Sequence, residues 1–176
     1  MDVDRFWHLI DATRGRENRA EELAKLLELQ PSDEIVRFRI AYDDILQAAN
    51  TVDLWGAAHV MNGGCTEDDF YEFRQGLIEL GHDVFDAAVA SPDGLARLAL
   101  PGTKIEGSET LDTAPMLAWT AKTGADEAAF FTAVDAADDR TDRAAIETGE
   151  HWNFNDPVEV FHRLPRLAAL MSKANE

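Results

Sequence analysis

The chain has 176 residues, of which 45% are hydrophobic and 28% are charged, as is typical of one folded domain with its own core. Its 34 acidic and 16 basic residues give a formal net charge of −18. This excess argues against binding to nucleic acids and to anionic membrane surfaces, because both are recognised by Lys and Arg side chains. A partner protein with a basic face remains compatible with it.

One cysteine cannot form an intramolecular disulfide bond, and the first residues lack the basic and apolar regions of a secretory signal. No stretch approaches the roughly 20 apolar residues that a membrane-spanning helix requires. We therefore expect a cytoplasmic protein in which residues 1–176 form a single helical domain.

The first third of the chain has the apolar spacing of amphipathic helices. A first helix follows Asp2 or Asp4 as N-cap, and a second follows Asn18. Pro31 ends the second helix, and Ser32 opens a longer, central one. The predicted buried side of this central helix consists of Ile35, Phe38, Tyr42, Ile45 and Ala49.

The middle of the chain predicts two helices that meet at a glycine corner. Asp53 is expected to cap the first helix, and the run Asn62-Gly63-Gly64 ends it. Thr66 and Asp69 form an approximate capping box at the start of the second. Small residues in the first helix would let another helix approach closely, with Trp55 filling the space beside them: Gly56, Ala57 and Ala58.

After the corner, Gly81 ends the second helix, a short helix covers 84–89, and Ser91 precedes a proline at the start of the next. Residues 101–110 are turn-rich, which predicts one exposed connection or a small extended segment.

Three further helices are expected in the last third of the chain. They begin at or near Pro115, Asp126 and Asp156, and the last of them runs without a break to Leu170. The sequence thus predicts an all-α, single compact domain of about eight to ten short helices.

Several motifs occur in a set order along the chain: Phe6-Trp7-x-Leu9-Ile10, Leu54-Trp55-Gly56-Ala57-Ala58, Asn62-Gly63-Gly64-Cys65, Phe70-x-x-Phe73-Arg74-x-x-Leu77-Ile78, Ser91-Pro92-Asp93-x-Leu95 and Leu164-Pro165-Arg166-Leu167. Their order and spacing resemble the bacterial family called domain of unknown function 4240 (DUF4240). Two departures are Thr66, where the family commonly has serine, and Gly76, where it often has tryptophan. We expect another side chain to fill the resulting gap. The resemblance implies a bacterial origin and a helical fold, but no activity, because the family is uncharacterised.

The glycine corner places the only cysteine, Cys65, just before a helix N-terminus, where positive potential lowers the pKa of a thiol. Nearby acids, among them Asp68, oppose a second negative charge there. We favour a structural role for Cys65 as a small apolar plug, with a reactive thiolate as the alternative.

Metal and phosphate sites at the corner are weaker hypotheses. His59, Cys65, Asp68 and Asp69 match no established ligand spacing, and helix capping explains the acids without a metal. The acids would also repel a phosphate from the amides of the glycine pair. We expect no metal and no cofactor.

Arg74 is interpreted as the ion-pair partner of Asp53, Asp68 or Glu72, with a substrate clamp as the alternative. Asn62 and Trp55 complete the candidate residues at the corner.

A second candidate site is the turn of His151 and Trp152. Its aromatic and amide-rich edge suits a ligand or a partner peptide, although packing onto the body of the protein is favoured.

No complete catalytic motif is present, so the leading hypothesis is a non-enzymatic binding or protein-interaction module whose partner has a basic face. One alternative is an enzyme that acts on a small molecule, with a pocket between Trp55 and Arg74. Another is an acidic nucleic-acid mimic or immunity-type neutraliser.

Overall fold

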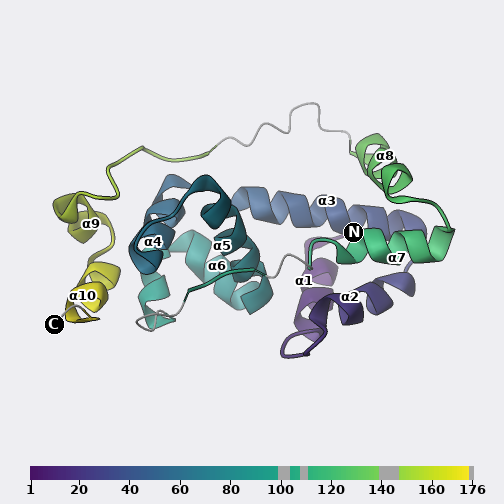
Figure 1. The fold of residues 1–176 in the computed structure, drawn as a ribbon, viewed down its shortest axis with the longest axis horizontal. Coiled ribbons are helices and arrows are strands. Elements are labelled where there is room, and N and C mark those ends of the chain that lie inside the picture. The colour runs from purple at the N-terminus through teal and green to yellow at the C-terminus, as the bar shows by residue number, and fades with distance from the viewer. Residues whose placement is uncertain (99–103, 108–110, 139–146, 175–176) are drawn as a thin grey trace. The chain divides into compact units, whose positions relative to one another are not determined.

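The computed structural model describes residues 1–98, 104–107, 111–138 and 147–174. In these ranges the regular secondary structure consists of ten α-helices and one 3₁₀ helix, η1, which confirms the predicted all-α class (Figure 1). The chain divides into two compact units, Met1–Gln47 with Ser108–Ala144 and Ala48–Gly107 with Ala145–Glu176. The expectation of a single domain over residues 1–176 remains a prediction.

The first unit combines helices from two separate stretches of the chain. Its described helices are α1 (Val3–Ala12), α2 (Arg19–Glu28), α3 (Ser32–Ala48, almost entirely in this unit), α7 (Ala114–Thr123) and α8 (Glu127–Ala137). Asp2 caps α1 as predicted, because its side chain accepts a hydrogen bond of 2.8 Å from the backbone N–H of Arg5. α2 and α7 lie side by side, and Lys122 Nζ donates to the carbonyl of Glu28 at 3.0 Å (Figure 1).

Aromatic rings form much of the core of this unit. The rings of Phe6 and Phe38 are fully buried, with centroids 4.8 Å apart. Phe130 packs with Val36, and its ring centroid lies 5.7 Å from that of Trp119. The predicted burial of the central helix is confirmed for Ile35, Phe38, Tyr42 and Ile45. Ala49 is buried as well, but it follows the end of α3 and belongs to the second unit.

The second unit contains the corner and the C-terminal helices. Its described helices are α4 (Val52–Asn62), α5 (Glu67–Leu80), α6 (His82–Ala90), η1 (Pro92–Arg97), α9 (Pro157–Arg163) and α10 (Pro165–Ala174). α10 packs against η1 and α4, and α9 packs against α4. Asp93 Oδ1 fixes the start of α10 by accepting hydrogen bonds from the backbone N–H groups of Arg166 and Leu167, at 2.9 and 3.1 Å.

The prediction that Asp53 caps α4 is wrong, because the N-cap is Thr51. Its hydroxyl accepts a hydrogen bond of 3.2 Å from the N–H of Leu54. Thr51 has the extended backbone that an N-cap requires, and it also forms a parallel β-bridge with Thr148. The helix therefore starts one residue before Asp53 and leaves the carboxylate of Asp53 available for other contacts.

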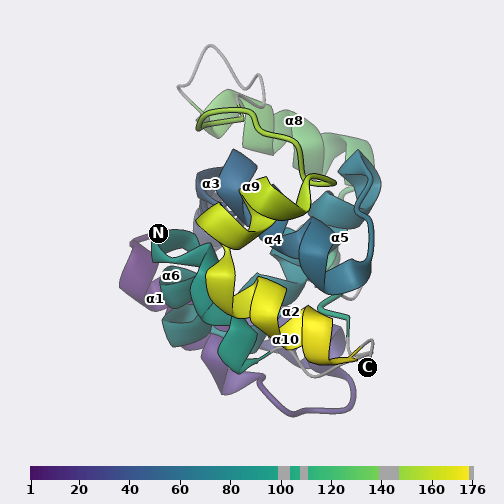
Figure 2. The same ribbon diagram turned by 90° about the vertical axis from the view of Figure 1, so that its left-hand side faces the viewer.

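The continuous last helix is also a wrong prediction, since the chain turns between α9 and α10 (Figure 2). Pro165 is the first residue of α10, and a proline disfavours helical geometry at the residue before it. Leu164 accordingly leaves the helical region, with φ −129° and ψ 57°. The start of α9 is as predicted, because the Asp156 side chain accepts from the N–H of Val158 at 2.9 Å.

The turn-rich connection predicted at 101–110 is described only over 104–107, which is not helical, and the remainder lies outside the described residues. This short segment runs along α5, where the N–H of Gly107 donates to the carbonyl of Glu72 at 2.8 Å. A Cβ on Gly76 would lie 2.9 Å from both the Glu106 carbonyl carbon and Ile105 Cγ2. Backbone and an isoleucine side chain therefore occupy the space beside Gly76, where a side chain alone was expected.

Candidate functional site

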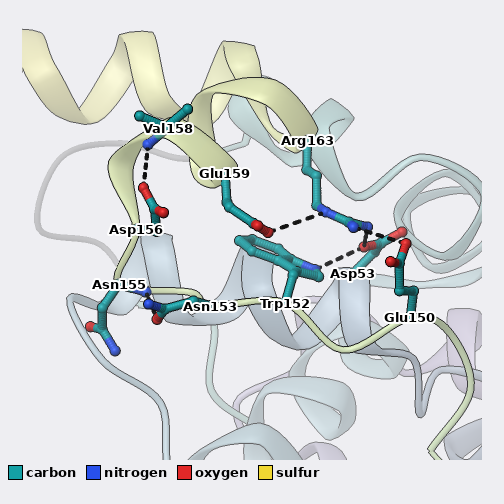
Figure 3. Close-up of polar contacts among 9 residues, drawn as sticks. All are labelled: Asp53, Glu150, Trp152, Asn153, Asn155, Asp156, Val158, Glu159 and Arg163. Atoms are coloured by element: carbon teal, nitrogen blue, oxygen red, sulfur yellow. Dashed lines mark hydrogen bonds and ion pairs between the residues drawn. The ribbon is translucent and has the colours of Figure 1, made fainter.

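The aromatic turn before α9 packs onto α4, as the sequence favoured. The indole of Trp152 lies against Gly56, so closely that a Cβ on Gly56 would stand 2.2 Å from Trp152 Cζ2. The indole N–H donates a hydrogen bond of 3.0 Å to Asp53 Oδ1 (Figure 3). The small residues of α4 were expected to admit another helix, but at Gly56 they admit a tryptophan from a loop.

Phe154 joins the two tryptophans that the sequence had placed in separate candidate sites. Its ring centroid lies 4.7 Å from that of Trp152 and 6.2 Å from that of Trp55. It also lies 5.6 Å from the ring of His59, whose Nε2 is 3.1 Å from Asn155 Oδ1. These contacts fasten the turn of residues 151–156 along α4. His151 extends into solvent, 3.8 Å from the carboxylate of Glu147.

An acidic cluster surrounds Arg163 at the end of α9 (Figure 3). The Arg163 guanidinium lies 3.0 Å from Glu150, 3.6 Å from Asp53 and 3.8 Å from Glu159. It also lies 5.5 Å from the centroid of the Trp152 ring. The hydrogen bond to Glu150 is the main reason that the pKa of Arg163 is raised above its usual value. Three carboxylates face one cation, so the cluster keeps an excess of negative charge.

An apolar groove opens on another part of α9. It has a volume of about 650 Å³ and is bordered by α4, α9 and α10. Val158 and Phe161 line it while remaining 75% and 64% exposed. Its remaining lining is mostly apolar: Val60, Phe154, Asn155, Pro157, Val160, Ala168, Met171 and Ser172. We call it the α9–α10 groove. Exposed apolar area of this kind is typical of an interaction site.

The glycine corner is held by ring stacking and by hydrogen bonds. Trp55 stacks on Phe70, with centroids 5.1 Å apart and planes 7° from parallel, and its indole N–H donates to the carbonyl of Cys65 at 3.1 Å. The capping box is confirmed, because Thr66 and Asp69 exchange side-chain and backbone hydrogen bonds. The hydrogen bond from the backbone N–H of Thr66 is the main reason that the pKa of Asp69 is lowered.

Electrostatics at the corner oppose a thiolate. Burial, followed by the charge of Asp69, raises the pKa of Cys65 to about 11. The thiol is therefore protonated near neutral pH, as a structural role requires. Asp68 is exposed on the first turn of α5 and Asn62 is half-buried with an unsatisfied Oδ1, so neither completes a catalytic arrangement with the sulfur.

Arg74 is buried, with 8% of its surface exposed, and lies over two aromatic rings. Its guanidinium carbon is 4.7 Å from the Phe70 centroid and 5.7 Å from that of Tyr71. Burial lowers the pKa of Arg74, and the charges of Tyr71, Glu67 and Glu147 oppose this shift. Glu67 and Glu147 thus act on the charge of Arg74, and the ion pair with Asp53, Asp68 or Glu72 that the sequence suggested remains a prediction.

The structure brings Trp55 and Trp152 together through Phe154. Phe70 connects Trp55 to Arg74, because both lie against its ring. The side chains of Asp68 and His151 are exposed. Sequence reasoning missed the roles of Asp53, Glu150, Glu159 and Arg163. These residues come together only when a segment about 100 positions downstream folds back onto α4. A weak signal was present in α9, where Val158 and Phe161 share a helical face with few polar residues to cover it.

In the described ranges, no group of three or more His, Cys, Asp and Glu side chains is arranged to hold a metal ion. None of the helices there has the length and apolarity needed to cross a membrane.

Comparison with curated proteins gave no match, and comparison with solved structures gave none either. The family model described as "Protein of unknown function (DUF4240)" matches residues 1–123. The match covers α1 to α7 with the corner and Gly56, and it ends before α9, α10 and the Leu164-Pro165-Arg166-Leu167 motif. With well over half of its length matched, the chain belongs to the DUF4240 family.

Proposed function

We propose that this protein is a non-enzymatic, cytoplasmic protein-interaction module that binds a segment of a partner protein along α9. The observation that carries this proposal is the α9–α10 groove, where Val158 and Phe161 stay exposed around an apolar hollow of about 650 Å³. An amphipathic helix laid into a groove is a common way to cover such a surface.

The acidic cluster supports a partner with basic residues beside its apolar face. Arg163 is the only cation among the four charged side chains of the cluster shown in Figure 3. A Lys or Arg of the partner would meet carboxylates that a single internal cation only partly neutralises. The overall charge of −18 would speed the approach of such a partner and would make binding sensitive to salt.

An enzyme at the Trp55–Arg74 corner receives less support from the geometry. The thiol of Cys65 is held protonated by its surroundings, Arg74 is buried over aromatic rings, and Asp68 lies in solvent. The groove and the acidic cluster offer a contact surface, whereas the corner offers mainly helix capping.

The test is capture of partners from the native cytoplasm at low salt with three forms of the protein. Phe161→Glu should weaken binding of the captured partner by at least about thirtyfold, since a central apolar contact is worth about 2 kcal/mol or more. The matched control is Leu29→Glu, which changes a 78% exposed leucine in the first unit and should leave binding intact.

A second variant addresses the charge. Glu150→Gln removes a carboxylate whose side chain is 81% exposed and should weaken capture at low salt more than at high salt. Equal loss from Phe161→Glu and Leu29→Glu would contradict the proposed surface. Capture of a nucleic-acid-binding protein through its DNA site would favour the mimic instead.

A further inference from the structure

A second hollow, separate from the α9–α10 groove, lies between α6, η1 and the start of α10. Its volume is about 310 Å³, at the small end of the range found for small-molecule pockets. Its floor includes Ala88 and Leu95, which are both 2% exposed. Further apolar lining comes from Val84, Ala87 and Leu98. We call it the α6–η1 hollow.

Two arginines line this apolar hollow in a protein with twice as many acids as bases. Within the described residues, Arg97 is exposed and takes part in none of the ion pairs, unlike Arg14, Arg37 and Arg163. Arg166 is 61% exposed, and its Nε lies 3.9 Å from Asp93 Oδ2, at the long limit of an ion pair. Asp93 is also engaged in capping α10 through its other oxygen. Both guanidinium groups can therefore accept a further anionic partner.

We propose that the α6–η1 hollow binds a small amphipathic carboxylate. Its apolar tail would lie on Ala88 and Leu95, and its carboxylate would be held by Arg97 and Arg166. Guanidinium groups suit this headgroup, because their parallel N–H donors match the two oxygens of a carboxylate.

The lining of the hollow favours a ligand that combines an anionic group with an apolar tail. Asp83 is exposed and contributes to the lining, so it opposes part of the attraction that Arg97 and Arg166 exert on an anion. Charge alone is therefore a weak source of affinity here, and the apolar contacts must contribute. The apolar floor likewise favours a ligand with a hydrocarbon tail over a free inorganic anion.

The experiment is a titration of the full chain with octanoate, followed by the backbone amide signals in NMR spectra. Saturable shifts should be confined to α6, η1 and the first turn of α10. Arg97→Gln and Arg166→Gln should each weaken binding by about tenfold or more, as loss of one charge-assisted contact predicts. Asp83→Asn should strengthen it.

Three controls make the outcome decisive. Arg37→Gln removes an exposed arginine of the first unit and should leave the affinity unchanged. 1-Octanol carries the same tail without the carboxylate and should bind at least about tenfold more weakly. The Arg166 substitution retains the backbone N–H that bonds to Asp93, so the start of α10 should keep its shifts in the free protein.

The proposal is overturned if octanoate and octanol bind equally well, or if neither arginine substitution changes the affinity. Shifts that do not saturate, or that gather in the α9–α10 groove, also overturn it. Each of these results leaves the proposed protein-binding role of the groove untouched, because the two hollows share no lining residue.

Discussion

The glycine corner and the Trp152 turn both contact α4, and they differ in how each was recognisable from the sequence. The corner holds rare residues, yet its contacts mainly close a helix end: Trp55 to the carbonyl of Cys65, and Thr66 to Asp69. The turn is aromatic and amide-rich, and it covers Gly56 and adjoins both an acidic cluster and an exposed apolar groove. The rare residues of the corner therefore form a helix end, whereas the candidate site lies at the exposed surface beside the turn.

The largest expected effect is on the labelling rate of Cys65, which tests whether the thiol at the corner is reactive. With a pKa of about 11, only about one Cys65 thiol in ten thousand is ionised at pH 7. Labelling by a thiol reagent should therefore be about a hundredfold slower in the folded protein than in urea, where the pKa returns to its ordinary value. The folded rate should rise about tenfold per pH unit up to pH 10. Labelling that is fast at pH 7 and independent of pH would make the corner a reactive site.

Removing Trp152 tests whether the packing of the turn on α4 stabilises the folded protein. Trp152→Ala should lower the free energy of unfolding by about 2 kcal/mol, less than for a fully buried tryptophan because this one is half-buried. Chemical denaturation of the full chain measures it. His151→Ala, one residue earlier and exposed, serves as the control and should change stability by less than about 0.5 kcal/mol. Equal effects of the two changes would mean that the turn is not packed on α4.

The effect of Gly56→Ala on the free energy of unfolding should change sign when Trp152 is removed. Gly56→Ala should destabilise the wild type by about 1–3 kcal/mol, since the added methyl group overlaps the indole. In the Trp152→Ala background the same change should stabilise by up to about 1 kcal/mol, because alanine is the better helix former. A double-mutant cycle from denaturant melts gives both values. If Gly56→Ala had the same sign in both backgrounds, Gly56 would not pack against Trp152.

The smallest effect concerns the capping box. Thr66→Ala should cost about 1 kcal/mol, whereas Thr132→Ala, in the interior of α8, should cost less. Because the pKa of Asp69 is lowered on folding, its stabilising contribution is complete above the pKa of the unfolded chain and is lost as the pH falls through the lower folded value. The stability difference between wild type and Asp69→Ala should therefore shrink in acid, and a constant difference would contradict this role.

These contacts also show what a sequence can predict. The Thr66–Asp69 box and the Asp156 cap were predicted because donor and acceptor lie two or three positions apart. Leu164 was placed inside a helix although the following proline disfavours it, a local signal that apolar periodicity concealed. Asp53 was misassigned as a cap, because its actual partners, Trp152 and Arg163, lie 99 and 110 positions further along the chain. No local pattern reports a pairing at that distance.

The Trp152–Gly56 contact affects how members of this family should be divided for study. A fragment ending at residue 123 keeps α4 whole yet strips away the indole, Phe154 and the two C-terminal helices that cover it. Its α4 would present bare apolar surface to solvent, which favours self-association. A protein expressed only over the matched region would then aggregate. If that fragment failed to bind a partner, the result would give no information about the intact chain.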